Sequence, residues 1–143
     1  GFADQMAKKY PGIKVLPVQY YNNDPSTAAS IVNNTLLTNP DLGGVFGGNL
    51  YGAQGAANAV ESSGAKLAVV CFDAGPAQSE ALQGGTIQAL VVQKPKLMGI
   101  RAAEMAQKIL KGEKVEKNIF LAPIIAFKKD IANKDVSQWF YGN

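Results

Sequence analysis

The chain of 143 residues contains no histidine and a single cysteine, Cys71. Without histidine it has no Ser-His-Asp triad, no Cys-His pair and no Cys/His zinc site. Cys71 has no partner for an intrachain disulfide and stands within an apolar run, where a free cysteine behaves as a small hydrophobic residue. These absences argue against an enzyme that works through a nucleophile and a base, and against a metal cofactor.

Long apolar runs and phosphate-binding loops are also lacking. No apolar run approaches the roughly 20 residues that a helix needs to span a bilayer. The glycines between positions 43 and 55 do not follow the G-x-G-x-x-G spacing, and no G-x-x-x-x-G-K-[ST] loop exists. The net charge is only +3, and the lysines are spread out apart from a cluster at 111–117. We therefore expect no nucleic-acid partner.

What is present is enough apolar sequence for a core, since 47% of the residues are hydrophobic. The length fits one domain or part of a larger one. The chain begins at Gly1-Phe2 without methionine. A trimmed product and a fragment of a longer protein both stay open.

Apolar segments typical of strands alternate along the chain with segments of helical periodicity. Strands are predicted at 13–20, 44–48, 67–73, 87–92 and 119–127. Helices are predicted at 2–10, 24–39, 52–62, 77–82 and 95–110, and a short turn or helix at 135–141. This order predicts an α/β fold, a layered parallel sheet flanked by helices. Pro17 places the first strand at an edge or a bulge.

The segment 67–73 has the strongest strand signal. Its continuous apolar run predicts a strand buried on both faces, and it ends in Asp73. Ligands of open α/β sheets bind outside the carboxyl ends of the strands, so Asp73 is a candidate ligand contact. The alternative is an aspartate that only caps the next helix.

Polar side chains follow the other strands as well. The strand ends carry 20–23, which includes Asn23, then Asn49, Asp73 and Gln93. Amides donate and accept, and a carboxylate accepts, which matches adjacent sugar hydroxyls. Nearby aromatic rings could stack on a sugar: Tyr20, Tyr21, Phe46, Tyr51 and Phe72. The alternative is that Asn49 and Gln93 only cap turns and that the aromatics belong to the core.

The C-terminal aromatic residues Trp139, Phe140 and Tyr141 allow two interpretations. They form either a plug that packs on the core, which we favour, or a surface for a partner.

Several short motifs resemble, in their order along the chain, the periplasmic sugar-binding proteins of ABC transporters, of the ribose/galactose (type I) family. These motifs are Gly1-Phe2, Leu36-Leu37-Thr38-Asn39-Pro40-Asp41, Val45-Phe46-Gly47-Gly48-Asn49, Cys71-Phe72-Asp73, Val92-Gln93-Lys94-Pro95, Gly99 and Leu110-Lys111-Gly112-Glu113. The same fold forms the sugar-sensing part of LacI-type repressors.

The resemblance implies two α/β lobes that clamp a sugar, with this chain as the C-terminal portion. Residues 1–92 and 115–130 would form the second lobe, and the helix at 94–112 would belong to the other lobe and expose an apolar face here. Asn23, Asn49, Asp73 and Gln93 would contact the sugar. One departure is that the family commonly has Asn-Asp where this chain has Asn49-Leu50.

The function implied is that of the substrate-binding component of an ABC sugar importer. Its partners would be a small sugar and a membrane permease, its location periplasmic or lipid-anchored and extracellular, and its action free of cofactors. The alternative is the effector domain of a LacI-type regulator, and an α/β enzyme is the third class. By itself this chain would bind sugar weakly or not at all, and its exposed helix would promote self-association.

Overall fold

A four-stranded sheet in the order β1-β2-β3-β4 organises the chain. The computed structural model describes residues 1–142, and its strands are β1 (Gly44–Gly47), β2 (Ala68–Phe72), β3 (Ala89–Val92) and β4 (Ile124–Ala126). The helices are α1 (Phe2–Lys9), α2 (Pro25–Thr38), α3 (Leu50–Ser63), α4 (Pro76–Gly84), α5 (Pro95–Leu110), the 3-10 turn η1 (Lys128–Asp130) and α6 (Lys134–Ser137). Strands β1, β2 and β3 are parallel, whereas β4 is antiparallel to β3.

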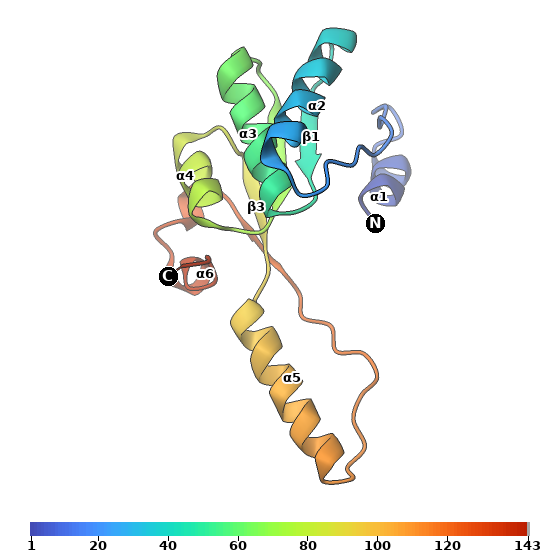
Figure 1. Cartoon of the computed structure of the whole chain (residues 1–143), viewed down its shortest axis with the longest axis vertical. Coiled ribbons are helices and arrows are strands. Elements are labelled where there is room, and N and C mark those ends of the chain that lie inside the picture. The colour runs from blue at the N-terminus through green and yellow to red at the C-terminus, as the bar shows by residue number, and fades with distance from the viewer. Residues whose placement is uncertain (143) are drawn as a thin grey trace.

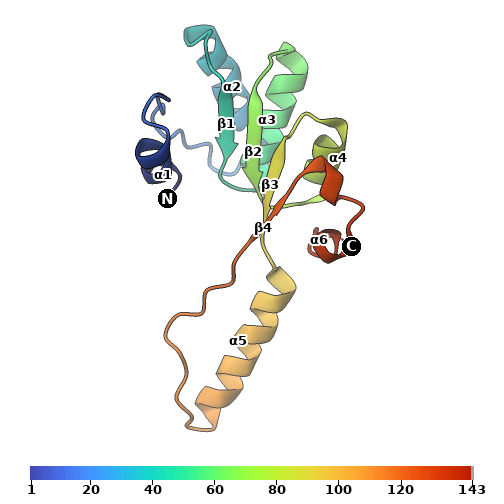
Figure 2. The same cartoon turned by 180° about the vertical axis from the view of Figure 1, so that it is seen from behind.

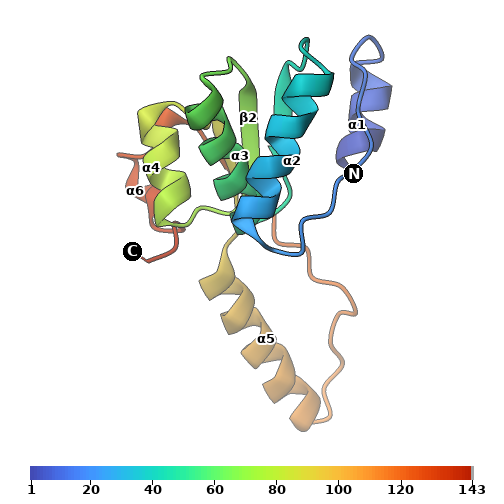
Figure 3. The ribbon, with the colours of Figure 1, turned by 45° about the horizontal axis from the view of Figure 1, so that its top comes forward.

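Three helices form a layer on one face of this sheet. Figures 1 and 3 show α2, α3 and α4 side by side in front of the strands, and Figure 2 shows the opposite face, where α1 lies beside β1. Phe2 of α1 stacks on Phe46 of β1 with ring centroids 4.6 Å apart. The fold is therefore the α/β class that the sequence predicts, with helices flanking a mainly parallel sheet.

The helices begin and end where local chemistry requires it. Asp24 caps α2 by accepting a hydrogen bond from the backbone N–H of Thr27 at 2.6 Å, and Pro25 follows at the first helical position. Gly64 and Gly85 end α3 and α4 with φ of 67° and 90°, a left-handed conformation that glycine adopts without a steric penalty.

Small residues let the helices approach each other and the sheet closely. A Cβ built on Gly55 of α3 would lie 2.6 Å from the carbonyl oxygen of Pro25 and would also meet the Cβ of Ala28, both in α2. A Cβ on Gly47 would lie 2.9 Å from the backbone nitrogen of Ala53. Since neither site has room for a methyl group, the alanine- and glycine-rich sequence of α3 is a packing requirement.

The predicted strand at 13–20 does not form, which corrects the sequence-based expectation. The segment is extended but has no ladder partner among residues 1–142, and most of it is exposed. Its side chains include Val18 and Tyr20, which are 72% and 85% exposed. Strand propensity alone does not make a strand, because the backbone groups need a neighbour to pair with.

The last strand differs as well. Only Ile124–Ala126 of the predicted 119–127 pairs, and it runs antiparallel rather than parallel. After β3 the chain continues directly into α5, turns near Gly112 and returns as an extended segment (Figures 1 and 2). A parallel strand would require a crossover back to the start of β3, and this connection makes none.

Strand β2 is buried on one face only, which corrects the expectation of burial on both. Val69 and Cys71 are fully buried under the helix layer, whereas Val70 and Phe72 point to the opposite face and are half-buried. The alternation follows from the two-residue period of a strand and from the single layer of α2, α3 and α4.

Helix α5 projects away from the sheet (Figure 1). None of its residues is buried, and the large apolar side chains that it exposes are Met98, Ile100, Ile109 and Leu110. Within residues 1–142, no helix combines the length and the apolar character needed to cross a bilayer.

We predict that Gly55→Ala lowers the free energy of unfolding by about 1–3 kcal/mol, because the added methyl group forces α2 and α3 apart. Gly99→Ala is the matched control: it lies in helix α5 with no atom within 4 Å of a built Cβ. It should raise stability by up to about 1 kcal/mol through helix propensity. Urea unfolding of both variants tests this, and equal effects would contradict the packing argument.

Candidate functional site

The predicted polar residues gather at the carboxyl ends of the three parallel strands. Asn49 follows β1, and Asp73 and Gln93 directly follow β2 and β3. Asn23 comes from the loop that precedes α2. The sheet topology brings these segments to one edge, as expected for ligand sites of open α/β sheets.

Asn49 connects this edge to the loop before α2. Its Oδ1 accepts hydrogen bonds from the hydroxyl of Tyr21 at 2.5 Å and from the backbone N–H groups of Tyr51 and Gly52 at 3.1 and 3.0 Å. Its Nδ2 donates to Oδ1 of Asn23 at 2.6 Å. Asn49 thus caps α3, and within residues 1–142 one N–H of its amide remains for a further partner.

Asp73 connects the end of β2 with three other parts of the chain. Its Oδ2 accepts a hydrogen bond from the backbone N–H of Leu50 at 3.1 Å, at the start of α3. Its Oδ1 accepts from Nε2 of Gln93 at 2.7 Å and from the hydroxyl of Tyr141 at 2.6 Å. Four predicted residues therefore form two bonded pairs, Asn49 with Asn23 and Asp73 with Gln93.

Asp73 does not cap the helix that follows it. The N-cap of α4 is Gly75, which offers no side chain. The carboxylate instead satisfies the first N–H of α3, so the cap interpretation of Asp73 named the wrong helix.

The backbone at this edge adopts an uncommon conformation. Asp73 has φ of 74°, and Asn22 and Asn23 have φ of 48° and 59°. Asn and Asp enter this left-handed region more readily than other non-glycine residues, but the conformation persists only where the surroundings hold it. Such positions concentrate at functional sites, which agrees with a ligand role for this edge.

The N-terminus of α3 offers no anion site. The N–H groups of its first three residues are bonded to Asp73 and Asn49 side chains, and the N–H of Ala53 to the Asn49 carbonyl oxygen. A phosphate requires such groups to be free. The edge therefore suits a neutral ligand with hydroxyl groups.

The hydroxyl groups of Tyr21 and Tyr141 stay protonated at neutral pH. Burial is the main cause that raises the pKa of Tyr21. Burial, the hydrogen bond to Asp73 and the charge of Asp73 raise the pKa of Tyr141. Each hydroxyl is thus a permanent donor. Burial also raises the pKa of the Cys71 thiol to about 12, so this residue is no nucleophile.

Sequence reasoning missed the hydroxyl roles of Tyr21 and Tyr141. Tyr21 was expected only as a ring that stacks on a ligand, and Tyr141 as part of a core plug. The plug interpretation holds for Phe140, which is 6% exposed. Phe46 packs against Phe2 instead of lying free for a ligand. No local motif signals either hydroxyl contact, because both join residues far apart in the chain.

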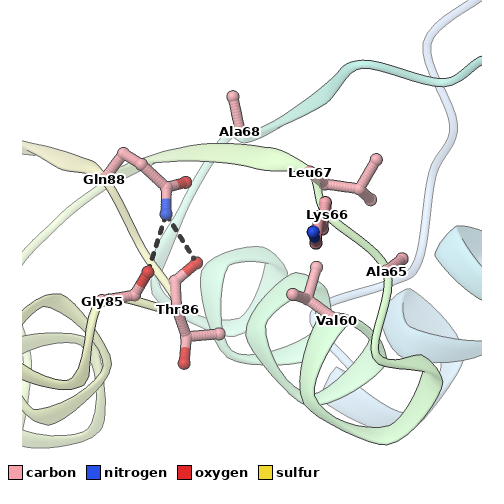
Figure 4. A pocket seen from close by; sticks show the side chains of 8 residues that line it. All are labelled: Val60, Ala65, Lys66, Leu67, Ala68, Gly85, Thr86 and Gln88. Atoms are coloured by element: carbon pink, nitrogen blue, oxygen red, sulfur yellow. Dashed lines mark hydrogen bonds between the residues drawn. The ribbon is translucent and has the colours of Figure 1, made fainter.

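A hollow lies elsewhere, near the start of β2 and β3 (Figure 4). It has a volume of about 480 Å³, and its lining includes Lys66, Leu67 and Gln88. The side chain of Gln88 already bonds the backbone of Val69 and of the 85–86 turn. The polar groups of Gln88 thus serve the fold, and none of the four predicted site residues lines this hollow.

The fold is an α/β unit whose polar candidate-site groups lie at the carboxyl ends of its parallel strands. A sequence model of the family described as periplasmic binding protein domain matches residues 1–114. The chain belongs to this family, and the resemblance stated from its motifs is confirmed.

Two kinds of relatives agree with this assignment. The ribose import binding protein of Salmonella typhimurium is 36% identical over 103 residues, which is 71% of this chain and 35% of that protein. An ABC transporter solute-binding protein from Agrobacterium vitis, solved with bound α-D-tagatopyranose, is 33% identical with a TM-score of 0.94. It covers 99% of this chain, and the match spans 48% of its own chain.

A second Agrobacterium vitis solute-binding protein, solved with D-fucose, has a TM-score of 0.90 and 29% identity over 98% of this chain and 49% of its own. A protein described as an ABC transporter, LacI family transcriptional regulator, from Brachyspira murdochii is more distant, with a TM-score of 0.68 and 25% identity over 83% of this chain and 41% of its own. The chain thus spans about a third of the curated relative and about half of the Agrobacterium structures.

We predict that Gly52→Ala disturbs the site, because a Cβ there would lie 2.5 Å from the Tyr21 hydroxyl oxygen and 2.8 Å from Cζ. Displacement of the ring breaks its bond to Asn49, and we expect a loss of about 1–3 kcal/mol in the free energy of unfolding. Gly48→Ala is the control, since a Cβ there meets nothing within 4 Å. Guanidinium unfolding measures both, and an unaffected Gly52→Ala would refute the close contact.

Proposed function

We propose that the protein that carries this chain is the substrate-binding component of an ABC sugar importer. The observation that carries the proposal is the row of carboxylate and amide groups at three adjacent strand ends, which retains hydrogen-bonding capacity after its internal bonds are made. The names of the relatives, which include ribose import and solute-binding proteins, support it.

The roles proposed for the four residues follow from that remaining capacity. Asp73 has accepted three hydrogen bonds, and a carboxylate offers about four acceptor positions. Among residues 1–142, Oε1 of Gln93 and Nδ2 of Asn23 have no hydrogen-bond partner. Sugar hydroxyls both donate and accept, so they can engage all of these groups together.

The two-lobed arrangement is part of the same proposal. Residues 1–92 and 115–130 would form one lobe, and the helix at 94–112 would pack in the other. Helix α5 supports this because it buries no residue here and stands apart from the sheet. Gln93 lies where the chain leaves the sheet for α5, and thus at the proposed crossing between lobes.

Function then consists of capture without a covalent step. Sugar contacts from both lobes favour the closed arrangement by differential affinity, and the closed form docks on the permease. We propose a periplasmic or lipid-anchored extracellular location. The distant LacI-family match keeps a sugar-sensing regulator as the second candidate, with the same site but a different output.

A sugar panel tests the function. We expect the full-length protein to bind at least one of D-ribose, D-tagatose and D-fucose in calorimetry, and the isolated 143 residues to bind weakly or not at all because half the clamp is missing. Gln93→Ala should weaken binding about tenfold or more, by removal of groups that contact the sugar.

Gln83→Ala is the matched control, since this exposed glutamine of α4 lies outside the site. Micromolar binding by the isolated chain would contradict the clamp. Failure of all three sugars to bind the full-length protein would count against the importer.

The exposed face of α5 gives a second test, because the isolated chain should self-associate through it. Replacement of Ile109 and Leu110 together by lysine should shift sedimentation toward the monomer. Leu37→Lys, at an apolar residue of α2 that is 80% exposed, is the control and should leave association unchanged. A monomeric unmodified chain at high concentration would oppose the assignment of α5 to another lobe.

A further inference from the structure

The C-terminal segment 139–141 lies across the loops that follow β2 and β3. Tyr141 donates its backbone N–H to the carbonyl oxygen of Ala74 at 2.8 Å and its hydroxyl to Oδ1 of Asp73 at 2.6 Å. Phe140 anchors the segment in the core. The ammonium group of Lys94 lies 5.6 Å from the centroid of the Trp139 ring. Aromatic residues from the end of the chain thus contact both loops that carry site residues.

Asp73 needs external support to keep its position. Its φ of 74° is unfavourable for a residue with a Cβ. The backbone is held by its own N–H, which donates to the Val91 carbonyl oxygen, and by the Tyr141 bond to the adjacent Ala74. The carboxylate is held by Leu50 on one oxygen and by Gln93 and Tyr141 on the other. Of the described residues, 1–142, Tyr141 is the one that bonds both the backbone of this turn and the carboxylate.

We propose that Tyr141 is a positioning residue for the sugar site, which acts by fixing the orientation of the Asp73 carboxylate. The inference rests on the proposed function and adds a residue from outside the predicted strand ends. With donors on both oxygens, rotation of the carboxylate costs at least one hydrogen bond. The remaining acceptor position of the Asp73 carboxylate therefore already points in a fixed direction before the sugar binds.

This pre-organisation is the source of the expected affinity. A carboxylate that is already oriented loses less conformational freedom when a sugar hydroxyl binds. Tyr141 suits the task because its partly buried hydroxyl stays protonated and has no acceptor among residues 1–142 other than Asp73. A plug that only fills space would need the ring and not the hydroxyl, and this difference separates the two roles.

The test removes only the hydroxyl. In the full-length protein, Tyr141→Phe should weaken binding of D-ribose, D-tagatose or D-fucose, whichever binds the unmodified protein, by about tenfold, the usual scale for one charge-assisted hydrogen bond. Tyr10→Phe is the control, at an exposed tyrosine of the α1 C-terminus. Unchanged affinity in Tyr141→Phe would overturn the proposal, even if the variant unfolds more easily.

A measurement without ligand separates this inference from the proposed function. The effects of Tyr141→Phe and Asp73→Asn on urea unfolding should be non-additive, whereas Tyr141→Phe combined with Asp41→Asn, at an exposed aspartate, should be additive. The carboxyl carbon resonance of Asp73 should shift in Tyr141→Phe and not in Tyr10→Phe. Additive effects and an unmoved resonance would refute the positioning role whether or not a sugar binds. If the Tyr141→Phe and Asp73→Asn effects are non-additive but the protein binds none of the three sugars, the positioning of Asp73 by Tyr141 is supported and the proposed importer function is rejected.

Discussion

The carboxylate of Asp73 is the junction on which the candidate site depends. It accepts hydrogen bonds from the backbone N–H of Leu50 at the start of α3, from the side chain of Gln93 after β3, and from the hydroxyl of Tyr141. These partners come from segments 23, 20 and 68 residues away in sequence. A single charged group can hold them because charge-assisted hydrogen bonds are stronger than neutral ones. The junction also fixes a strained backbone at the place where a ligand would bind.

The second constraint is the close contact between small residues. Gly55 lets α2 approach α3, and Gly47 lets α3 approach β1. Gly52 leaves the space in which the Tyr21 ring reaches Asn49. The spacing of these glycines thus determines where Asn49 and its partners lie, so the packing of α3 and the geometry of the site are set by the same residues.

Much of the fold and three strand-end residues could be predicted because their signals are local. These signals act within a few residues: Asp24-Pro25 begins α2, Gly64 and Gly85 end α3 and α4, and an apolar run precedes Asp73. Two features could not be predicted: the absence of a strand at 13–20 and the antiparallel direction of β4. Both depend on which neighbouring strand is available for pairing. One-sided burial of β2 has the same origin, since the layer of α2, α3 and α4 covers one face of this strand. The hydrogen bond of the Tyr141 hydroxyl could not be predicted because its partner, Asp73, is 68 residues away in the sequence.

The failed strand and the exposed helix have a common physical meaning. In the described part of the chain (1–142), residues 13–20 carry strand-forming side chains but have no pairing partner, and α5 has an amphipathic pattern but no buried residue. Local sequence and global fold normally agree in a protein that folds to one structure. Here they disagree at two places, and within residues 1–142 each place lacks a neighbour to pair with or to pack against. Both discrepancies therefore support the proposal that this chain works beside a second lobe, whereas the bonded pairs around Asp73 and Asn49 are complete without one.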